Sequence, residues 1–271
     1  MILIVASTED VAGINIAQQI IDHHEFEKFS EVFHQNPVYS RKVQNREVKL
    51  VFVNEEIVNT QFITKFFSPQ LLVFISKHRS VSGRPTLSVH TPGNLAEAEL
   101  GGIPRRVSVS PASALRDALL EMAKAKEEMG LEYEVSYECT HHGPSLDVPT
   151  MFVELGSSPK QWRDKRAAEA VARAAMAAVS KQSRYTAVLG AGGPHYNAKF
   201  TRIALSTPTA FGHIIPKYAI SRVDDEMVRQ CVERTVESVG SVILDWKGIK
   251  GADKERLRAI LNEIAIPIEK V

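Results

Sequence analysis

The sequence has few cysteines, an almost even balance of charge and no long apolar segment. Its two cysteines, Cys139 and Cys231, are too few for a disulfide scaffold and lack the close pairing of zinc-binding cysteine motifs, which fits a reducing compartment. The 33 basic and 32 acidic residues give a net charge of +1, so a polyanion must be bound by a local patch. The longest apolar runs are far shorter than the roughly 20 residues of a membrane span. The opening MILIVAST indicates a first strand and not a secretory leader, and we expect a cytoplasmic protein that does not bind membranes.

Several signatures of common enzyme classes are also missing. The sequence contains no GxxxxGK[ST], HExxH, GxSxG or CxxC motif, which excludes a phosphate-binding P-loop. The segment GAGGPHY at 190–196 follows a predicted strand, but it lacks the third glycine of a dinucleotide fingerprint and the acidic residue about 20 positions later. A nicotinamide enzyme is therefore disfavoured.

What is present is an alternation of short apolar strands and amphipathic helices. Three continuous apolar runs, at 1–6, 71–75 and 187–189, are typical of strands covered on both faces. Helices are predicted near the N-terminus and over 110–130, 158–180, 224–239 and 253–264, and further strands over 47–53, 106–109, 132–139, 150–155, 203–206 and 241–245. The alternation predicts an α/β protein, a three-layer α/β/α sandwich with a mixed, largely parallel sheet.

The chain shows no internal repeat and no linker rich in glycine, serine or proline. We expect a single α/β unit over residues 1–271. An irregular stretch near 80–105 marks the place where a smaller N-terminal lobe, residues 1–80, would pack on a catalytic part, 81–271. The evenly amphipathic helices favour a monomer.

Ligands of open parallel sheets bind beyond the carboxyl ends of the strands, so the polar residues that follow the strands are the candidate site. The densest group is ECTHHGP at 138–144, where His141 and His142 follow the carboxylate of Glu138. Twin histidines beside a carboxylate suit general acid–base catalysis or a divalent metal. As an alternative, Glu138 alternates with Glu134 and Glu132 on one face of the strand and would be one more solvated glutamate.

Glu154 lies in MFVEL at 151–155, a run that otherwise belongs to the core. A buried carboxylate must be paired, hydrogen-bonded or protonated, because burying it bare is too costly. Its partner would be a histidine, a metal or, in a purely structural role, an arginine.

Other polar groups lie in loops or at strand ends. They are four histidines, several basic residues and a pair of glycines. A single histidine in such a place is more often a surface or capping residue than a ligand. Basic clusters are often ordinary surface charge, and a glycine pair is often a plain turn. The histidines are His78, His90, His195 and His213; the basic residues include Lys77, Arg79 and Lys217; the glycines are Gly192 and Gly193.

Six segments, taken in their order along the chain, resemble those of the D-aminoacyl-tRNA deacylases of the archaeal and plant type. The segments are SKHRS (76–80), HTPGN (90–94), ECTHHGP (138–144), VPTMFVELGS (148–157), GAGGPHY (190–196) and GHIIPKYA (212–219). The first strand and helix and a turn at NPVY (36–39) are also similar to that family. SKHRS departs from the family's usual form, because Lys77 stands for an arginine and Arg79 for a serine.

The resemblance implies hydrolysis of the ester between a D-amino acid and the terminal ribose of tRNA, with glycyl-tRNA as a second substrate. It implies a phosphorylase/hydrolase-like fold of the peptidyl-tRNA hydrolase-like group and one or two Zn²⁺ ions. The partner is the acceptor end of aminoacyl-tRNA, and no protein partner is required.

Expected roles follow from the resemblance and from what ester hydrolysis needs. The catalytic residues are Glu138, His141, His142 and Glu154; the zinc ligands are His78, His90, His142 and His195; the substrate or tRNA contacts are Lys77, Arg79, Asn94, Gly192, Gly193, Lys217 and Tyr218. The two glycines would receive the oxyanion or the ribose, the cations would bind phosphates, and Tyr218 would stack on the terminal adenine. Two alternatives stay open: a zinc amidohydrolase or peptidase with a small substrate, and a non-catalytic RNA-binding protein.

Overall fold

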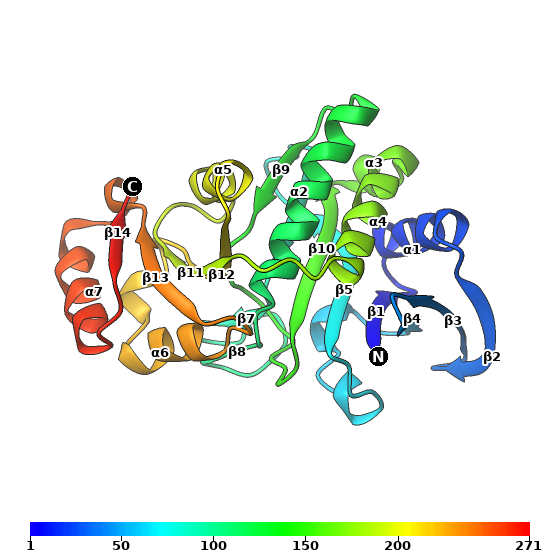
Figure 1. Ribbon diagram of the computed structural model, residues 1–271, viewed down its shortest axis with the longest axis horizontal. Helices are drawn as coiled ribbons and strands as arrows, with labels where there is room; N and C mark the ends of the chain where they lie inside the picture. The colour runs from blue at the N-terminus through cyan, green and yellow to red at the C-terminus, as the bar shows by residue number, and fades with distance from the viewer.

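The computed structural model describes residues 1–271 and contains two main sheets (Figure 1). The larger has eight strands in the order β2-β3-β4-β1-β5-β10-β6-β9. Its strands are β1 (Ile2–Ser7), β2 (Glu27–Phe33), β3 (Asn36–Val43), β4 (Arg46–Val53), β5 (Leu71–Arg79), β6 (Thr86–His90), β9 (Glu134–Tyr137) and β10 (Thr150–Ser157). The central strands β4, β1, β5 and β10 are parallel, whereas β6 runs antiparallel to β10, so the predicted α/β fold with a mixed sheet is confirmed.

The smaller sheet is parallel throughout, in the order β12-β11-β13-β14. Its strands are β11 (Thr186–Ala191), β12 (Thr209–Ile215), β13 (Val239–Leu244) and β14 (Ile268–Lys270), and a separate ribbon joins β7 (Gly93–Asn94) to β8 (Arg106–Val107). In Figure 1, β2 lies at one end of an elongated molecule and α7 (Gly251–Glu263), next to β14, at the other, with β10 and β12 between them.

Helices cover both sheets. They are α1 (Val11–His23), α2 (Ala112–Met129), α3 (Pro159–Trp162), α4 (Lys165–Ser180), α5 (Ala198–Ser206), α6 (Asp225–Glu233) and α7 (Gly251–Glu263), with short 3-10 helices η1 (Ile57–Asn59), η2 (Ile63–Lys65), η3 (Ile220–Arg222) and η4 (Trp246–Gly248). None of them is long and apolar enough to cross a membrane.

The layers follow from the apolar pattern of the strands. Helices α1, α2 and α4 share a core of 43 buried residues with one face of the large sheet, and the alanines of α4 let α2 and α1 pack closely against it. In β11, Val188 belongs to that core and Leu189 to a second one under α6 and α7, because successive side chains of a strand point to opposite faces. The smaller sheet is thus covered on both faces.

Three details differ from the sequence prediction. Residues 203–206 are not a strand but the end of α5, because Asn197 caps this helix at the Phe200 N–H and the apolar faces of Phe200 and Ala204 both turn inward. The segment predicted as one helix over 158–180 is divided at Asp164, whose carboxylate caps α4. The NPVY segment lies in β3 and is not a turn.

The large sheet also crosses the predicted division near 80–105. Strand β10 pairs with β5 on one side and with β6 on the other, so strands from both sides of residue 80 form one continuous sheet. The large and the small sheet meet where Glu138 bridges to Tyr196.

Candidate active site

Three neighbouring strands and two loops bring the candidate residues together. Glu154 of β10 pairs with Ser76 of β5, and His78 lies two residues further along β5 on the same face as Ser76. His90 ends β6, and Glu138 follows β9. The bridge between Glu138 and Tyr196 adds the loop after β11, which carries His195. The two sheets thus meet at one cluster of titratable side chains.

Two buried carboxylates form the floor of this cluster. Glu138 Oε2 accepts a hydrogen bond of 2.8 Å from His195 Nε2, and Glu138 Oε1 lies 3.2 Å from His78 Nδ1. Glu154 Oε1 accepts a 2.6 Å hydrogen bond from the Ser76 hydroxyl, and its Oε2 lies 3.4 Å from His78 Nδ1. The alternative of a solvated Glu138 is wrong, because the loop after β11 covers it and leaves it 1% exposed. No arginine pairs with Glu154.

The carboxylates favour the protonated form of two histidines. Burial opposes protonation of His78, but Glu138 and Glu154 outweigh burial and raise the pKa of His78 above its ordinary value. Burial also opposes protonation of His195, but its hydrogen-bond partners Cys139 and Glu138 raise the pKa of His195 to about 10. Burial likewise disfavours the charged form of Glu138, and the neighbouring His78 and His195 hold its pKa well below the ordinary range. We refer to His78, His195, Glu138 and Glu154 as the charged group.

The remaining three histidines, His90, His141 and His142, form a neutral group. Their ring centroids lie 4.2 to 4.9 Å apart, and burial lowers the pKa of each imidazole. His141 Nδ1 lies 2.8 Å from the Cys139 carbonyl oxygen and His142 Nδ1 lies 2.7 Å from the Gly143 carbonyl oxygen. Since a neutral imidazole facing a carbonyl must donate, Nε2 of both rings carries a lone pair. Both ring nitrogens of His90 are buried without a hydrogen-bond partner.

This arrangement separates the predicted ligands into two sets. His90, His141 and His142 each offer a ligand atom, and these atoms lie within 4.8 Å of one another. Two further groups meet the same distance: Cys139 with His141 and His195, and His78 with Glu138 and Glu154. Of the predicted ligands, His90 and His142 thus belong to the neutral group, whereas His78 and His195 contact Glu138.

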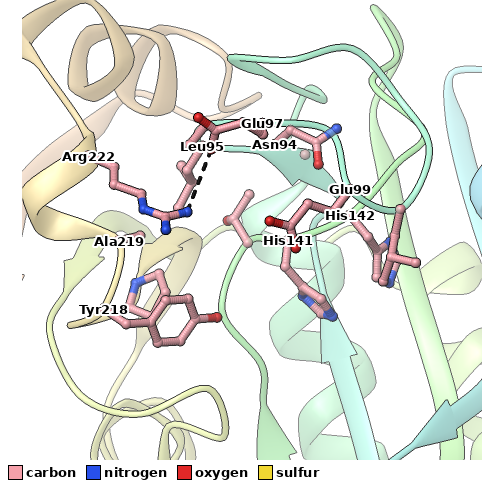
Figure 2. A pocket seen from close by; sticks show the side chains of 14 residues that line it. Asn94, Leu95, Glu97, Glu99, His141, His142, Tyr218, Ala219 and Arg222 are labelled. Carbon is pink, nitrogen blue, oxygen red and sulfur yellow. Dashed lines mark ion pairs between the residues drawn. The ribbon is translucent and has the colours of Figure 1, made fainter.

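Two cavities open above the cluster and share three lining residues, Leu100, His141 and His142. The smaller cavity, of about 250 Å³, extends from this shared wall toward Tyr218 and Arg222 (Figure 2). The larger, of about 430 Å³, extends over His78, Glu154 and His195 toward β1 and η1. A ligand that occupies both cavities must pass over His141 and His142.

The predicted substrate contacts are distributed unevenly. Lys77 and Arg79 line the larger cavity, and Asn94 and Tyr218 line the smaller one. The Asn94 amide donates to the carbonyl oxygens of Gly101 and Ile103, so this side chain holds the loop that carries Leu100. Lys217 is exposed and lines neither cavity.

The glycine pair and His213 lie outside the cavities. The Gly192 N–H donates to the Ile215 carbonyl, and a Cβ on Gly193 would approach Asn197 Nδ2 to 2.5 Å, so both glycines permit a tight turn and line neither cavity. The expected role of Gly192 in receiving an oxyanion is therefore not supported, because its N–H already has a partner. His213 is fully buried between the Thr140 hydroxyl and the Arg234 carbonyl.

Sequence reasoning missed two contributors, Ser76 and Tyr196. The Ser76 hydroxyl binds Glu154, and the Tyr196 hydroxyl hydrogen-bonds His78 Nε2. Ser76 could have been found, since it lies two residues before His78 on the same strand face. Tyr196 could not, because its position depends on how the two sheets meet.

The site combines buried carboxylates with cationic and neutral histidines beneath two joined cavities. Such a site suits acid–base chemistry on a bound substrate, which is typical of hydrolases. A family model described as D-aminoacyl-tRNA deacylase matches residues 65–269. The D-aminoacyl-tRNA deacylase of Pyrococcus furiosus is 33% identical, with 100% of both chains covered, and that of Thermococcus kodakarensis is 34% identical, with 98% of each covered. The chain belongs to the D-aminoacyl-tRNA deacylase family.

A solved structure shares the whole fold. The crystal structure of AF0625, a conserved protein of unknown function, is 27% identical in sequence and superposes with a TM-score of 0.88. The match covers 100% of this chain and 95% of that one. Both sheets therefore belong to one shared architecture.

Proposed function

We propose that this protein hydrolyses the ester bond between a D-amino acid and the terminal ribose of tRNA. One observation carries the assignment: a neutral histidine group and a charged group lie side by side beneath two joined cavities. Family membership supplies the substrate class. Glycyl-tRNA is a second substrate, since glycine has no side chain that a chiral pocket could reject.

The neutral group fits the zinc ion that the family resemblance implies. Zinc binds neutral imidazole nitrogens, and metal-binding histidines usually donate their other ring N–H to a carbonyl or carboxylate. His141 and His142 meet both conditions, and the buried His90 has two nitrogens without a partner. These three residues would hold the ion and leave a coordination position open. A zinc ion bound there would lower the pKa of a water molecule and polarise the ester carbonyl.

The charged group performs the proton transfers in this proposal. Glu154 lines the larger cavity and accepts the proton of the attacking water as the new carbon–oxygen bond forms. His195 lies with its ring centroid 4.4 Å from that of His141 and stabilises negative charge on the carbonyl oxygen. As the bond to the ribose oxygen breaks, that oxygen takes a proton from His195. Glu138 lines neither cavity and acts as a positioning residue that keeps His195 protonated.

The experiment is release of labelled tyrosine from D-tyrosyl-tRNA and L-tyrosyl-tRNA, with and without a chelator. We expect rapid loss of the D-ester alone and inhibition by the chelator. Because every relevant residue lies on one chain, we also expect a monomer to be active, and we place the reaction in the cytoplasm. Cleavage of neither ester above its spontaneous rate would refute the proposal. Turnover of N-acylated amino acids by the same preparation would then support a zinc amidohydrolase.

A further inference from the structure

We propose that the two cavities divide the substrate between them: the larger binds the terminal adenosine and its 5′-phosphate, and the smaller binds the amino acid. The inference rests on the proposed function and assigns each half of the substrate to a place. It also reassigns Tyr218, which lines the smaller cavity and would contact the amino acid instead of stacking on adenine.

The shared wall sets where the ester must lie. Leu100, His141 and His142 line both cavities, so a ligand that fills both places its middle over the two histidines. The loop that carries Leu100 is held in place, because the Gly143 N–H donates to the Leu100 carbonyl at 2.8 Å and Gly101 packs on the backbone of Val58. In an aminoacyl ester the scissile bond joins the nucleoside to the amino acid. Each cavity therefore receives one of these two parts.

The larger cavity has the chemistry of a nucleotide site. Lys77 and Arg79 contribute positive charge to its lining, and the Lys77 ammonium lies 3.8 Å from Glu56. The carboxylates of Glu9 and Glu56 offer acceptors for ribose hydroxyls, and Ile57 offers an apolar contact for a base. A phosphate, a polyol and a flat apolar ring match these three features.

An aromatic cluster lies in the segment that follows the cavity-lining residues Ile57 and Val58. Just beyond η1, Phe62 and Phe66 pack with His34, and the Phe62 and His34 rings are stacked with centroids 5.2 Å apart. Phe66 is 61% exposed, which is unusual for so large an apolar side chain. Unpaired nucleotides stack on such rings. The single-stranded nucleotides before the terminal adenosine would therefore approach from this side.

The smaller cavity has fewer cations than the larger one. Its lining contains one arginine, Arg222, which lies 3.6 Å from Glu97 (Figure 2), whereas both Lys77 and Arg79 line the larger cavity. Leu95, Ala96 and Tyr218 form an apolar to mildly polar wall, and Glu99 offers a carboxylate to an α-ammonium group. Its volume of about 250 Å³ is the smaller of the two, as expected for a single amino acid.

The test uses adenosine 5′-monophosphate as a probe and two substrates, D-tyrosyl-tRNA and D-alanyl-tRNA. Ala96→Phe fills part of the smaller cavity, and Arg79→Gln removes a cation from the larger one. For Ala96→Phe we expect kcat/KM for the D-tyrosyl ester to fall at least tenfold more than for the D-alanyl ester, with inhibition by the probe unchanged. For Arg79→Gln we expect several-fold weaker inhibition by the probe and an equal rise of KM for both substrates.

The opposite pattern would overturn the inference. If Ala96→Phe weakens inhibition by the probe while Arg79→Gln changes the preference between tyrosine and alanine, the cavities are assigned the wrong way round. Equal effects of both variants on every readout would mean that the cavities do not divide the substrate. Binding of the probe to each folded variant, measured by calorimetry, tests the assignment even if wild-type protein cleaves neither ester, an outcome that would refute the proposed function instead.

Discussion

Five histidines share one cluster in this protein, yet they fall into two electrostatic classes. His78 and His195 contact Glu138 directly and have raised pKa values. His90, His141 and His142 lie against one another, His141 and His142 also contact backbone carbonyls, and the pKa values of all three are lowered. Burial pushes all five toward the neutral form. Glu138 and Glu154 at His78, and Cys139 and Glu138 at His195, outweigh burial. At His141 burial prevails, although its Nε2 lies 3.6 Å from Glu138 Oε2.

The difference assigns separate tasks to neighbouring rings. A neutral imidazole can bind a metal or accept a proton, whereas an imidazolium stabilises negative charge and donates a proton. The His141 and His195 ring centroids are only 4.4 Å apart, so both functions act on one bound ester. Each prediction below removes or isolates one side of this contrast.

The largest effect is expected from Glu138→Gln, which keeps the shape of the side chain and removes its charge. His78 and His195 then lose one of the groups that favour their protonated forms, and turnover should fall on the order of 10³-fold while the protein remains folded. Single-turnover deacylation and circular dichroism measure the two quantities. Glu134→Gln is a matched control, because Glu134 is an exposed glutamate of the adjoining strand β9. Near-normal turnover of Glu138→Gln would contradict the role of the charged group.

Removing a ring of the neutral group should affect the metal. His142→Ala is expected to weaken zinc binding by more than the roughly 10–100-fold typical of losing an outer-shell partner. His195→Gln should retain zinc, because this residue belongs to the charged group. Zinc content of the purified variants, measured by mass spectrometry, distinguishes them. Zinc retained by His142→Ala but lost from Glu154→Gln would place the ion at His78, Glu138 and Glu154 instead.

A smaller effect concerns the cations beyond the charged group. Lys77→Gln and Arg79→Gln should each make tRNA binding less sensitive to salt. Because each variant loses one contact with a single-strand phosphate, the slope of log K against log salt concentration should become less steep by about 0.7. Filter binding at several salt concentrations gives the slope. Arg184→Gln carries the same charge change at an exposed position that lines neither cavity. The same slope in all three variants would remove Lys77 and Arg79 from the tRNA contact.

The sequence predicted the members of this cluster better than their grouping. Apolar runs and their polar ends placed His78 and Glu138 at strand ends and Glu154 inside a buried strand, because strand periodicity is a local property of the chain. Which histidine meets which carboxylate depends on the order of strands and on the contact between the two sheets. For the same reason the alternation on β9 suggested a solvated Glu138, although the loop after β11 buries it. Residues 203–206 were assigned to a strand because a short apolar run does not distinguish a strand from a buried helix turn.

His213 isolates the effect of burial and supports the smallest prediction. It is fully buried without a carboxylate neighbour, and burial lowers its pKa to about 4, below the ordinary 6.5. The unfolded chain therefore binds this proton first, so the stability contributed by neutral His213 is present above about pH 6.5 and is lost as the pH falls toward 4. Between pH 7 and pH 5 this contribution to the free energy of unfolding decreases by about 2 kcal/mol.

Urea unfolding at both pH values should show a smaller decrease in the free energy of unfolding, from pH 7 to pH 5, for His213→Gln than for wild type. His23→Gln, at an exposed position, should keep the wild-type drop. An unchanged drop in His213→Gln would show that burial alone does not set the charge of this imidazole, and the contrast between the two histidine groups would need another cause.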